Sequence, residues 1–120
     1  MYSVLLLFDD KQLESELRSL TVWGEVGSFE MTSGSYATDL DGLAGHELII
    51  AEKAKGLELL HAAHRQRREL RVELCSRDRD FESARLGIVL GAYDYITAPF
   101  DPMQIHSILT SKFVKKAAGK

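Results

Sequence analysis

Short apolar runs and longer amphipathic stretches alternate along the chain. The run YSVLLLF, residues 2–8, is apolar without a break, which is typical of a strand covered on both faces. The stretch that follows carries Leu13, Leu17 and Leu20 on one helical stripe. Further strands are expected at 25–32, 47–52, 69–76 and 93–97.

Helices are expected between these strands and after the last one. They are 11–20, a weak polar helix within 33–46, 57–68, 80–91 and one that begins at Pro102. The helix at 80–91 has Phe81, Ala84 and Ile88 on one stripe, and Gly91 suits its C-terminal cap. This repeated strand–helix order predicts a parallel sheet with helices on both faces and right-handed crossovers.

The residues that follow the predicted strands are the first candidates for a functional site. In a doubly wound sheet, sites lie beyond the C-terminal ends of the strands. That rule selects Asp9, Asp10, Glu52, Cys75 and the turn at 97–99. These positions are distant in sequence, and the topology predicts that they converge in space.

Composition and charge limit the classes of function. The chain has 120 residues, enough for one domain, and its 45% apolar and 28% charged residues are ordinary for a globular protein. A net charge of −3 gives no general reason to bind nucleic acid, and the basic run at 64–71 spans a helix end where such charge is usually solvated. No apolar run is long enough for a membrane span, and a single cysteine fits a reducing cytoplasm.

Three motifs carry a resemblance to a known family. They are the acidic pair after the first strand, GLELL at 56–60, and LGAYDYITAPFDP at 90–102 where the family has LGADDYLTKPFDP. The chain resembles the receiver domain of bacterial response regulators, a flavodoxin-like (βα)5 three-layer α/β sandwich with sheet order 2-1-3-4-5. The resemblance covers 1–115, with 116–120 as a tail or the start of a linker. The segments VWGEVGSFEM and DFESARLGIVLGAYDY are closest to receivers that precede AraC-type DNA-binding domains.

The resemblance implies a four-part site for phosphoryl transfer. In the family an acidic pair holds Mg²⁺, and an aspartate that ends strand 3 accepts the phosphoryl group. A Ser or Thr that ends strand 4 and a lysine that ends strand 5 stabilise the phosphoryl oxygens. Asp9 and Asp10 match the acidic pair, whereas Glu52, Cys75 and Ala98 align with the other three positions.

These replacements predict a degenerate site. Loss of the lysine and the hydroxyl removes several orders of magnitude of rate, and the loop at 53–55 is too short to supply a metal ligand. We therefore expect a pseudo-receiver that is not an enzyme, signals without aspartate phosphorylation and needs no cofactor, with weak Mg²⁺ binding at Asp9 and Asp10 at most. One alternative is a phosphorylation-competent receiver that uses Glu52 or another carboxylate with Mg²⁺. Another is a standalone adaptor, and Glu52 as a mimic of the phosphorylated state is a third hypothesis.

The family's output face implies protein partners. Tyr95 matches the switch aromatic, and Pro99 shapes the turn after strand 5, where the resemblance predicts a cis Ala98–Pro99 bond. Contacts with a partner or a second copy are expected on the helix at 80–91, the last strand and the last helix. The candidate residues are Asp80, Glu82, Arg85, Asp94, Gln104 and Lys112, with an ordinary solvated face as the alternative. A C-terminal DNA-binding output domain outside this chain, and so a role in transcription regulation, is also implied.

Two positions on the fourth predicted strand leave alternatives open. Cys75 is either a redox sensor or an inert thiol, because neighbouring carboxylates raise a thiol pKa and lower its reactivity. Glu73 occupies a position that is apolar in the family. It is expected either to reach the surface or to pair with a basic residue.

Overall fold

In the computed structural model, which describes residues 2–34 and 40–111, five parallel strands form one central sheet. The strands are β1 (Tyr2–Leu7), β2 (Phe29–Gly34), β3 (Leu48–Glu52), β4 (Val72–Ser76) and β5 (Tyr95–Thr97). Their order across the sheet is β2-β1-β3-β4-β5, and each neighbouring pair is parallel. This confirms the predicted flavodoxin-like fold class.

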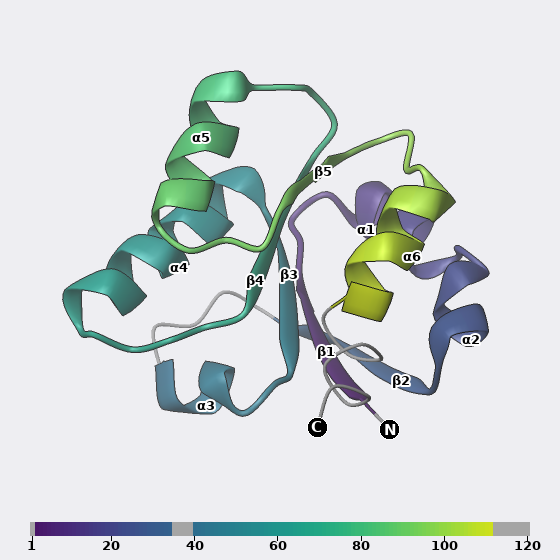
Figure 1. The fold of residues 1–120 in the computed structure, drawn as a ribbon, viewed down its shortest axis with the longest axis horizontal. Helices are drawn as coiled ribbons and strands as arrows, with labels where there is room; N and C mark the ends of the chain where they lie inside the picture. The colour runs from purple at the N-terminus through teal and green to yellow at the C-terminus, as the bar shows by residue number, and fades with distance from the viewer. Residues whose placement is uncertain (1, 35–39, 112–120) are drawn as a thin grey trace.

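Helices cover both faces of the sheet. They are α1 (Lys11–Arg18), α2 (Val22–Val26), α3 (Leu40–Ala44), α4 (Lys53–Arg65), α5 (Phe81–Val89) and α6 (Pro102–Leu109). Figure 1 shows α1, α2 and α6 on one side of the sheet and α3, α4 and α5 on the other. The buried apolar side chains form two clusters, one under each group of helices, so the domain has three layers.

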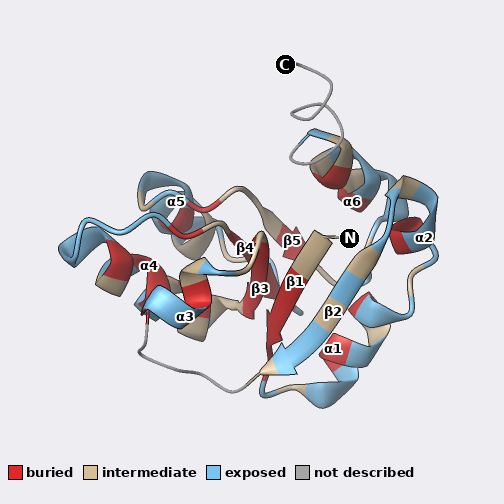
Figure 2. Ribbon diagram, turned by 90° about the horizontal axis from the view of Figure 1, so that it is seen from below, coloured by how far each residue is buried: buried red, intermediate tan, exposed pale blue. Residues whose placement is uncertain are grey.

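The central strands are buried on both faces, as Figure 2 shows in red. Along β1, Val4 and Leu6 enter the cluster under α1 and α6, whereas Leu5 and Leu7 enter the cluster under α3 and α4. This explains the unbroken apolar run, because both sides of the strand need apolar residues. The edge strand β2 has only half-buried and exposed residues.

Leu74 on β4 shows how closely two helices approach the sheet. A Cβ atom on Gly56 of α4 would collide with one δ-methyl of Leu74, and a Cβ on Gly87 of α5 would collide with the other. Leu74 is fully buried, so it has no open space into which to move. The two glycines therefore allow α4 and α5 to lie directly against β4.

Several predicted element boundaries differ from the structure, and two of the differences affect how the chain is built. Part of the strand expected at 25–32 is helical: α2 spans Val22–Val26, because Trp23 is buried there and its indole N–H donates to the Leu17 carbonyl at 2.9 Å. The helix expected at 57–68 starts four residues earlier, at Lys53, directly after β3. The residues expected to form a short loop are thus the first turn of α4.

The apolar stripe expected on α5 does not face the core. The side chains of Phe81 and Ile88 are 77% and 50% exposed, whereas Gly87 is buried. The glycine without a side chain is the residue that meets β4, so the larger apolar residues are rotated toward solvent. This correction exposes an apolar helix surface that the sequence assigned to the interior.

The segment from α5 to α6 follows the sequence prediction closely. Gly91 has a φ of 104° after the end of α5, and the Asp101 carboxylate accepts the N–H of Met103 at the start of α6. The Ala98–Pro99 peptide bond is cis, as predicted. The expected domain boundary at residue 115 lies outside the described residues. Among the described helices, none has the length and apolar character needed to cross a membrane.

Candidate functional site

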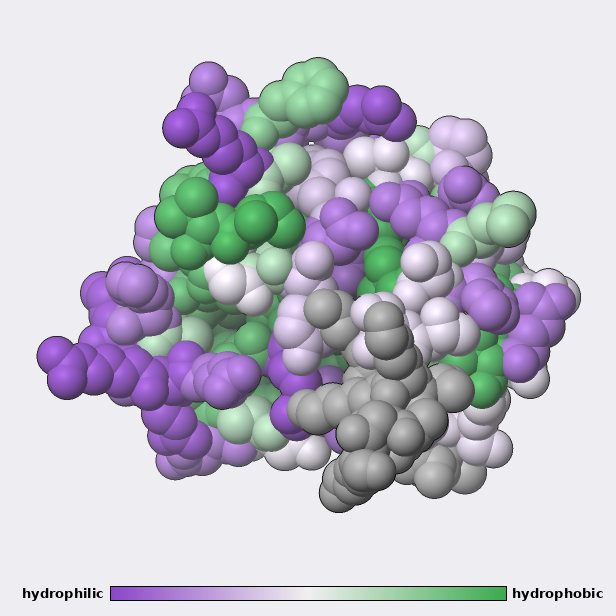
Figure 3. All heavy atoms as spheres, viewed as in Figure 1, coloured by the Kyte–Doolittle hydropathy of each residue, from purple (hydrophilic) through white to green (hydrophobic). Residues whose placement is uncertain are grey.

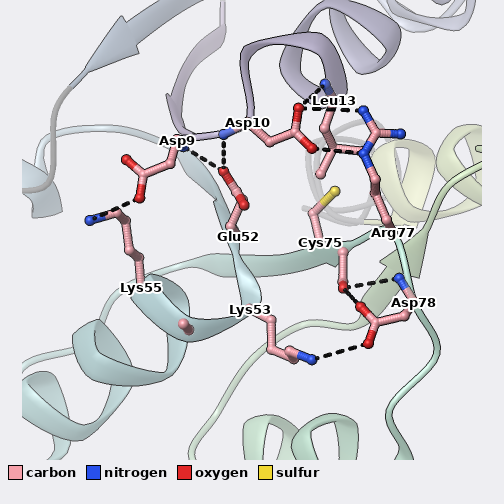
Figure 4. A pocket seen from close by; sticks show the side chains of 11 residues that line it. Asp9, Asp10, Leu13, Glu52, Lys53, Lys55, Cys75, Arg77 and Asp78 are labelled. Atoms are coloured by element: carbon pink, nitrogen blue, oxygen red, sulfur yellow. Dashed lines mark hydrogen bonds and ion pairs between the residues drawn. The ribbon is translucent and has the colours of Figure 1, made fainter.

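A cavity of about 320 Å³ lies beyond the C-terminal ends of β1, β3 and β4. Figure 4 shows the side chains that point into it from three separate parts of the chain. The lining residues are Asp9, Asp10, Leu13, Glu52, Lys53, Ala54, Lys55, Cys75, Ser76, Arg77 and Asp78. The sheet therefore brings four of the predicted pocket residues together, namely Asp9, Asp10, Glu52 and Cys75.

Glu52, the last residue of β3, turns its carboxylate toward the β1–α1 turn. Its Oε1 atom accepts the backbone N–H of Asp9 at 2.5 Å and that of Asp10 at 2.7 Å. The resemblance aligns Glu52 with the family's acceptor aspartate, and a glutamate side chain is one methylene longer than an aspartate. The carboxylate is thus already occupied as a hydrogen-bond acceptor that joins β3 to the β1–α1 turn.

Asp10 is held by its own helix and by an arginine. Its Oδ1 accepts the N–H of Leu13, which caps α1, and its Oδ2 accepts the Arg77 Nε–H at 2.7 Å. The second Arg77 nitrogen, Nη2, lies 3.4 Å from Asp10 Oδ1 and 3.0 Å from Glu16 Oε2. The hydrogen bond from Arg77, followed by that from Leu13, lowers the pKa of Asp10 below its ordinary value.

Lysines from the first turn of α4 add two more positive charges to the pocket rim. Lys53 Nζ lies 3.3 Å from Asp80 and 3.6 Å from Asp78, and Lys55 Nζ lies 3.5 Å from Asp9. Burial works against the charge of Lys53, but the Asp80 hydrogen bond and the neighbouring negative charges raise its pKa overall. Each basic side chain in the pocket is therefore paired with a carboxylate.

The hydroxyl expected to be missing is present one residue further along β4. The strand ends at Ser76, as predicted, and Ser76 is buried. Its hydroxyl donates to Asp78 Oδ1 at 2.6 Å, and this hydrogen bond, followed by the charge of Lys53, lowers the pKa of Asp78. Ser76 therefore brings a hydroxyl into the pocket beside Cys75, and the sequence analysis did not include it among the pocket residues.

Cys75 lines the pocket with its thiol in the apolar core. The residue is fully buried and belongs to the cluster under α1 and α6. Burial, followed by the charges of Glu52 and Glu73, raises the pKa of the thiol to about 12. An inert structural thiol fits these facts better than a redox sensor.

Ala98 does not line the pocket, and no charged group reaches in from β5. Its N–H donates to the Ser76 carbonyl at 3.0 Å, and its side chain packs against the core under α6. The positive charges come instead from α4 and the β4–α5 loop. Sequence reasoning missed Lys53, Lys55 and Arg77 as pocket residues, because the carboxylates that they meet include residues far away along the chain.

Tyr95 on β5 is tied to the same loop. Its hydroxyl donates to the backbone carbonyl of Asp78 at 3.2 Å, while its ring packs against the cluster under α4. Asp78 also accepts the Ser76 hydroxyl through its side chain. The loop after β4 therefore joins the pocket to Tyr95.

The carboxylates of the pocket do not form a cation site. Asp10 is bound to Arg77 and Leu13, Asp9 is paired with Lys55, and Glu52 accepts two backbone amides. Within residues 2–34 and 40–111 there is no group of three or more His, Cys, Asp or Glu side chains arranged to hold a metal ion. The residues present thus do not fit the Mg²⁺ that the family's chemistry needs.

Glu73 and several residues of the predicted output face are more buried or more engaged than expected. Glu73 is 1% exposed, so the expectation that it reaches the surface is wrong. Asp80 caps α5 by accepting the N–H groups of Glu82 and Ser83, and it also binds Lys53. Asp94 accepts the N–H of Tyr95.

The other candidates of the output face vary in exposure. Glu82, Arg85 and Pro99 are exposed, Gln104 is half-buried, and Lys112 lies outside the described residues.

Comparison with solved structures places this geometry in a known fold. The receiver domain of Francisella response regulator 1452 matches with a TM-score of 0.72 and 18% identity, over 97% of this chain and 99% of that one. The receiver domain of a Bacteroides fragilis response regulator matches with a TM-score of 0.70 and 22% identity, over 93% and 96%. The chain has the receiver-domain fold.

A longer regulator contains the same fold. Full-length FixJ from B. japonicum matches with a TM-score of 0.72 and 21% identity, over 95% of this chain but 58% of that one. No protein-family model and no curated protein sequence matches the chain. The receiver fold is therefore shown by structure alone.

Proposed function

We propose that this receiver-fold domain acts in signal transduction through protein–protein contacts, without aspartate phosphorylation and without catalysing a reaction. The observation that carries the proposal is the orientation of Glu52. A phosphoryl acceptor needs a free carboxylate oxygen placed for in-line attack, next to a metal and a lysine. Here the Glu52 carboxylate accepts two backbone amides, and Ala98 stands in the place of the lysine.

The same contacts argue against Glu52 as a mimic of the phosphorylated state. In the family the phosphoryl group acts on the strand 4 hydroxyl and the strand 5 lysine. The Ser76 hydroxyl instead donates its hydrogen to Asp78 and is not directed at Glu52. The Glu52 carboxylate holds the end of β3 against the β1–α1 turn. Its hydrogen bonds go to that turn and not to Ser76, so it does not act on the Ser76 hydroxyl as a phosphoryl group would.

We place the contact surface on α5, β5 and α6. Phe81 and Val89 on α5 are 77% and 73% exposed, and Met103 on α6 is 79% exposed. Figure 3 shows a group of apolar side chains over α5 on this face of the molecule. Exposed apolar groups rimmed by charges such as Glu82 and Arg85 are typical of protein contact sites, so a second copy or another protein is the expected partner.

The wider setting follows from the resemblance and the comparisons. The match to part of full-length FixJ supports a regulator in which a receiver fold is joined to further sequence. A C-terminal DNA-binding output domain of the AraC type, a role in transcription regulation and a cytoplasmic location remain part of this proposal. A standalone adaptor is the second candidate, and the sequence that follows Lys120 in the gene distinguishes the two.

The direct test is exposure to phosphoryl donors. The domain is incubated with Mg²⁺ and acetyl phosphate or beryllofluoride, and its backbone amide NMR signals are followed, with a phosphorylatable receiver domain as the positive control. We expect no saturable shifts at Glu52 or Tyr95 and no change in intact mass. Saturable shifts at both residues would show that the pocket is phosphorylation-competent and would overturn the proposal.

A further inference from the structure

The positive charge of the Arg77 guanidinium lies beside the negative charge of Asp10, one of the two residues of the acidic pair. It binds both oxygens of Asp10, through Nε at 2.7 Å and Nη2 at 3.4 Å, and Nη2 also lies 3.0 Å from Glu16. Arg77 comes from the β4–α5 loop, whereas Asp10 and Glu16 belong to the start and the middle of α1. Figure 4 shows the side chain reaching across the pocket toward Asp10.

A divalent cation would have to displace this contact. Mg²⁺ requires near-octahedral oxygen ligands and loses its water reluctantly, so it binds where several carboxylate oxygens are free. Both oxygens of Asp10 already accept hydrogen bonds, and Asp9 is paired with Lys55. Arg77 belongs to the same chain as Asp10, and its planar guanidinium matches the geometry of a carboxylate.

We propose that Arg77 is a built-in replacement for the divalent cation of the receiver pocket, which makes the pocket complete without metal and ties the β4–α5 loop to α1. Arg77 directly follows Ser76, the last residue of β4, so its contact with Asp10 fixes the start of that loop. On the other side Lys53 binds Asp78 and Asp80 of the same loop. Ion pairs within the chain thus hold the β4–α5 loop against α1 and α4, a role that metal and phosphoryl contacts have in the family. This role of Arg77 concerns the same pocket as the proposed function but does not depend on that function.

The test is a gain of metal binding when the arginine is removed. Mn²⁺ is titrated into the wild type, Arg77→Met and Arg79→Met, and paramagnetic broadening of the amide signals is measured, with no phosphoryl donor present. Arg79→Met is the matched control, because Arg79 is exposed in the same loop and has no ion pair with a described residue. We expect no saturable broadening around Asp9 and Asp10 in the wild type or the control, and an apparent Mn²⁺ affinity at least about tenfold higher in Arg77→Met.

Two further variants keep the test decisive. Adding Asp10→Asn to Arg77→Met removes the gained site if Asp10 is the ligand that the arginine blocks. Arg77→Lys keeps a positive charge without the fork, and we expect an affinity between those of the wild type and Arg77→Met, which decides the question if the methionine variant does not fold. Saturable Mn²⁺ binding at Asp9 and Asp10 in the wild type overturns the inference, as does an unchanged affinity in a folded Arg77→Met.

The two proposals fail separately. A wild type that binds Mn²⁺ without responding to beryllofluoride overturns the role of Arg77 and leaves the proposed function standing. A wild type that responds to beryllofluoride overturns the proposed function whatever the metal titration gives in the absence of a phosphoryl donor.

Discussion

The Glu52 carboxylate and the backbone N–H of Asp10 form a hydrogen bond of 2.7 Å that joins the end of β3 to the turn after β1. Together with the bond to the Asp9 N–H, it makes Glu52 a structural residue of the turn. We expect Glu52→Ala to lower the free energy of unfolding by about 1–3 kcal/mol, because hydrogen bonds to a charged acceptor contribute about that much. Glu52→Gln keeps an acceptor oxygen and should lose less. Urea unfolding followed by the fluorescence of the single tryptophan, Trp23, measures both, and equal losses would contradict the hydrogen-bonding role.

The fit of Leu74 between two glycines predicts a steric effect. Gly87→Ala places a methyl group against a δ-methyl of Leu74, which is confined on its other side by Gly56, so we expect a loss of about 1–3 kcal/mol in unfolding free energy. Gly24→Ala is the matched control, because it lies in α2 with open space around it. Removal of a helical glycine there should stabilise the fold by about 0.5–1 kcal/mol. A Gly87→Ala variant as stable as the wild type would show that α5 does not lie against β4 as described.

The thiol of Cys75 should be unreactive while the domain is folded. Its pKa is raised to about 12 from 9.0, so the thiolate is scarce at neutral pH and the sulfur is inaccessible. We expect labelling by a disulfide reagent only at the rate at which the protein unfolds, which urea increases.

The raised thiol pKa also has a consequence for stability in alkali. Above pH 9 the unfolded thiol of Cys75 loses its proton while the folded thiol keeps it, so stability falls with rising pH by up to about 1.4 kcal/mol per pH unit from this group. The alkaline loss should be smaller in Cys75→Ala. Rapid labelling of Cys75 by the disulfide reagent in native buffer, without urea, would contradict a buried and unreactive thiol.

The lowered pKa of Asp10 predicts how Arg77 acts on stability across pH. A carboxylate with a lowered folded pKa stabilises the fold above its unfolded value of about 3.8, and this contribution is lost as the pH falls below that value. Arg77 stays charged throughout this range. The difference in unfolding free energy between the wild type and Arg77→Met should therefore be constant near neutral pH and should decrease in acid, as Asp10 becomes protonated. Unfolding curves from pH 7 to pH 3 measure the difference, with Arg79→Met as the control. A difference that persists unchanged below the pKa would show that Asp10 is not the partner.

The apolar surface of α5 predicts association. If a second copy binds there, the mass measured by sedimentation should rise with concentration, and Phe81→Glu with Val89→Glu should keep the protein monomeric, because both side chains are more than two thirds exposed. Glu30→Arg changes charge on β2 at the opposite edge of the sheet and should leave association unchanged. A wild type that is monomeric at all concentrations points to a different protein as the partner of α5.

Much of the fold could be read from local patterns. The apolar run at 2–8, the cap residue Asp101 and the glycine at position 91 each act over a few residues, and the structure places them as the sequence predicts. The alternation of strands and helices predicted a parallel sheet with helices on both faces. The sheet order came from the resemblance to receiver domains, and the structure has that order. The motif around Pro99 also carried its cis peptide bond.

The pocket could be located but not described from the sequence. Arg77 lies 67 residues from Asp10 along the chain, and nothing in the sequence around either residue announces their contact. Cys75 and Ser76 are neighbours at the end of β4 and both line the pocket, but the sequence did not show that the Ser76 hydroxyl would meet Asp78 there. The direction of the Glu52 carboxylate likewise depended on amides supplied by another strand end.

The helix caps and the absence of a lysine at position 98 follow from the sequence, because the caps depend on residues that are neighbours along the chain and the lysine on the identity of one residue. The fold class follows from the alternation of strands and helices together with the resemblance to receiver domains. Which charges meet in the pocket, and which face of α5 is exposed, depends on the tertiary contacts. Ion pairs and helix rotation arise from contacts between distant segments, here Asp10 with Arg77 and Gly87 with Leu74. An acidic pair of this kind can bind a metal ion or an arginine, and here the fold brings Arg77 to Asp10.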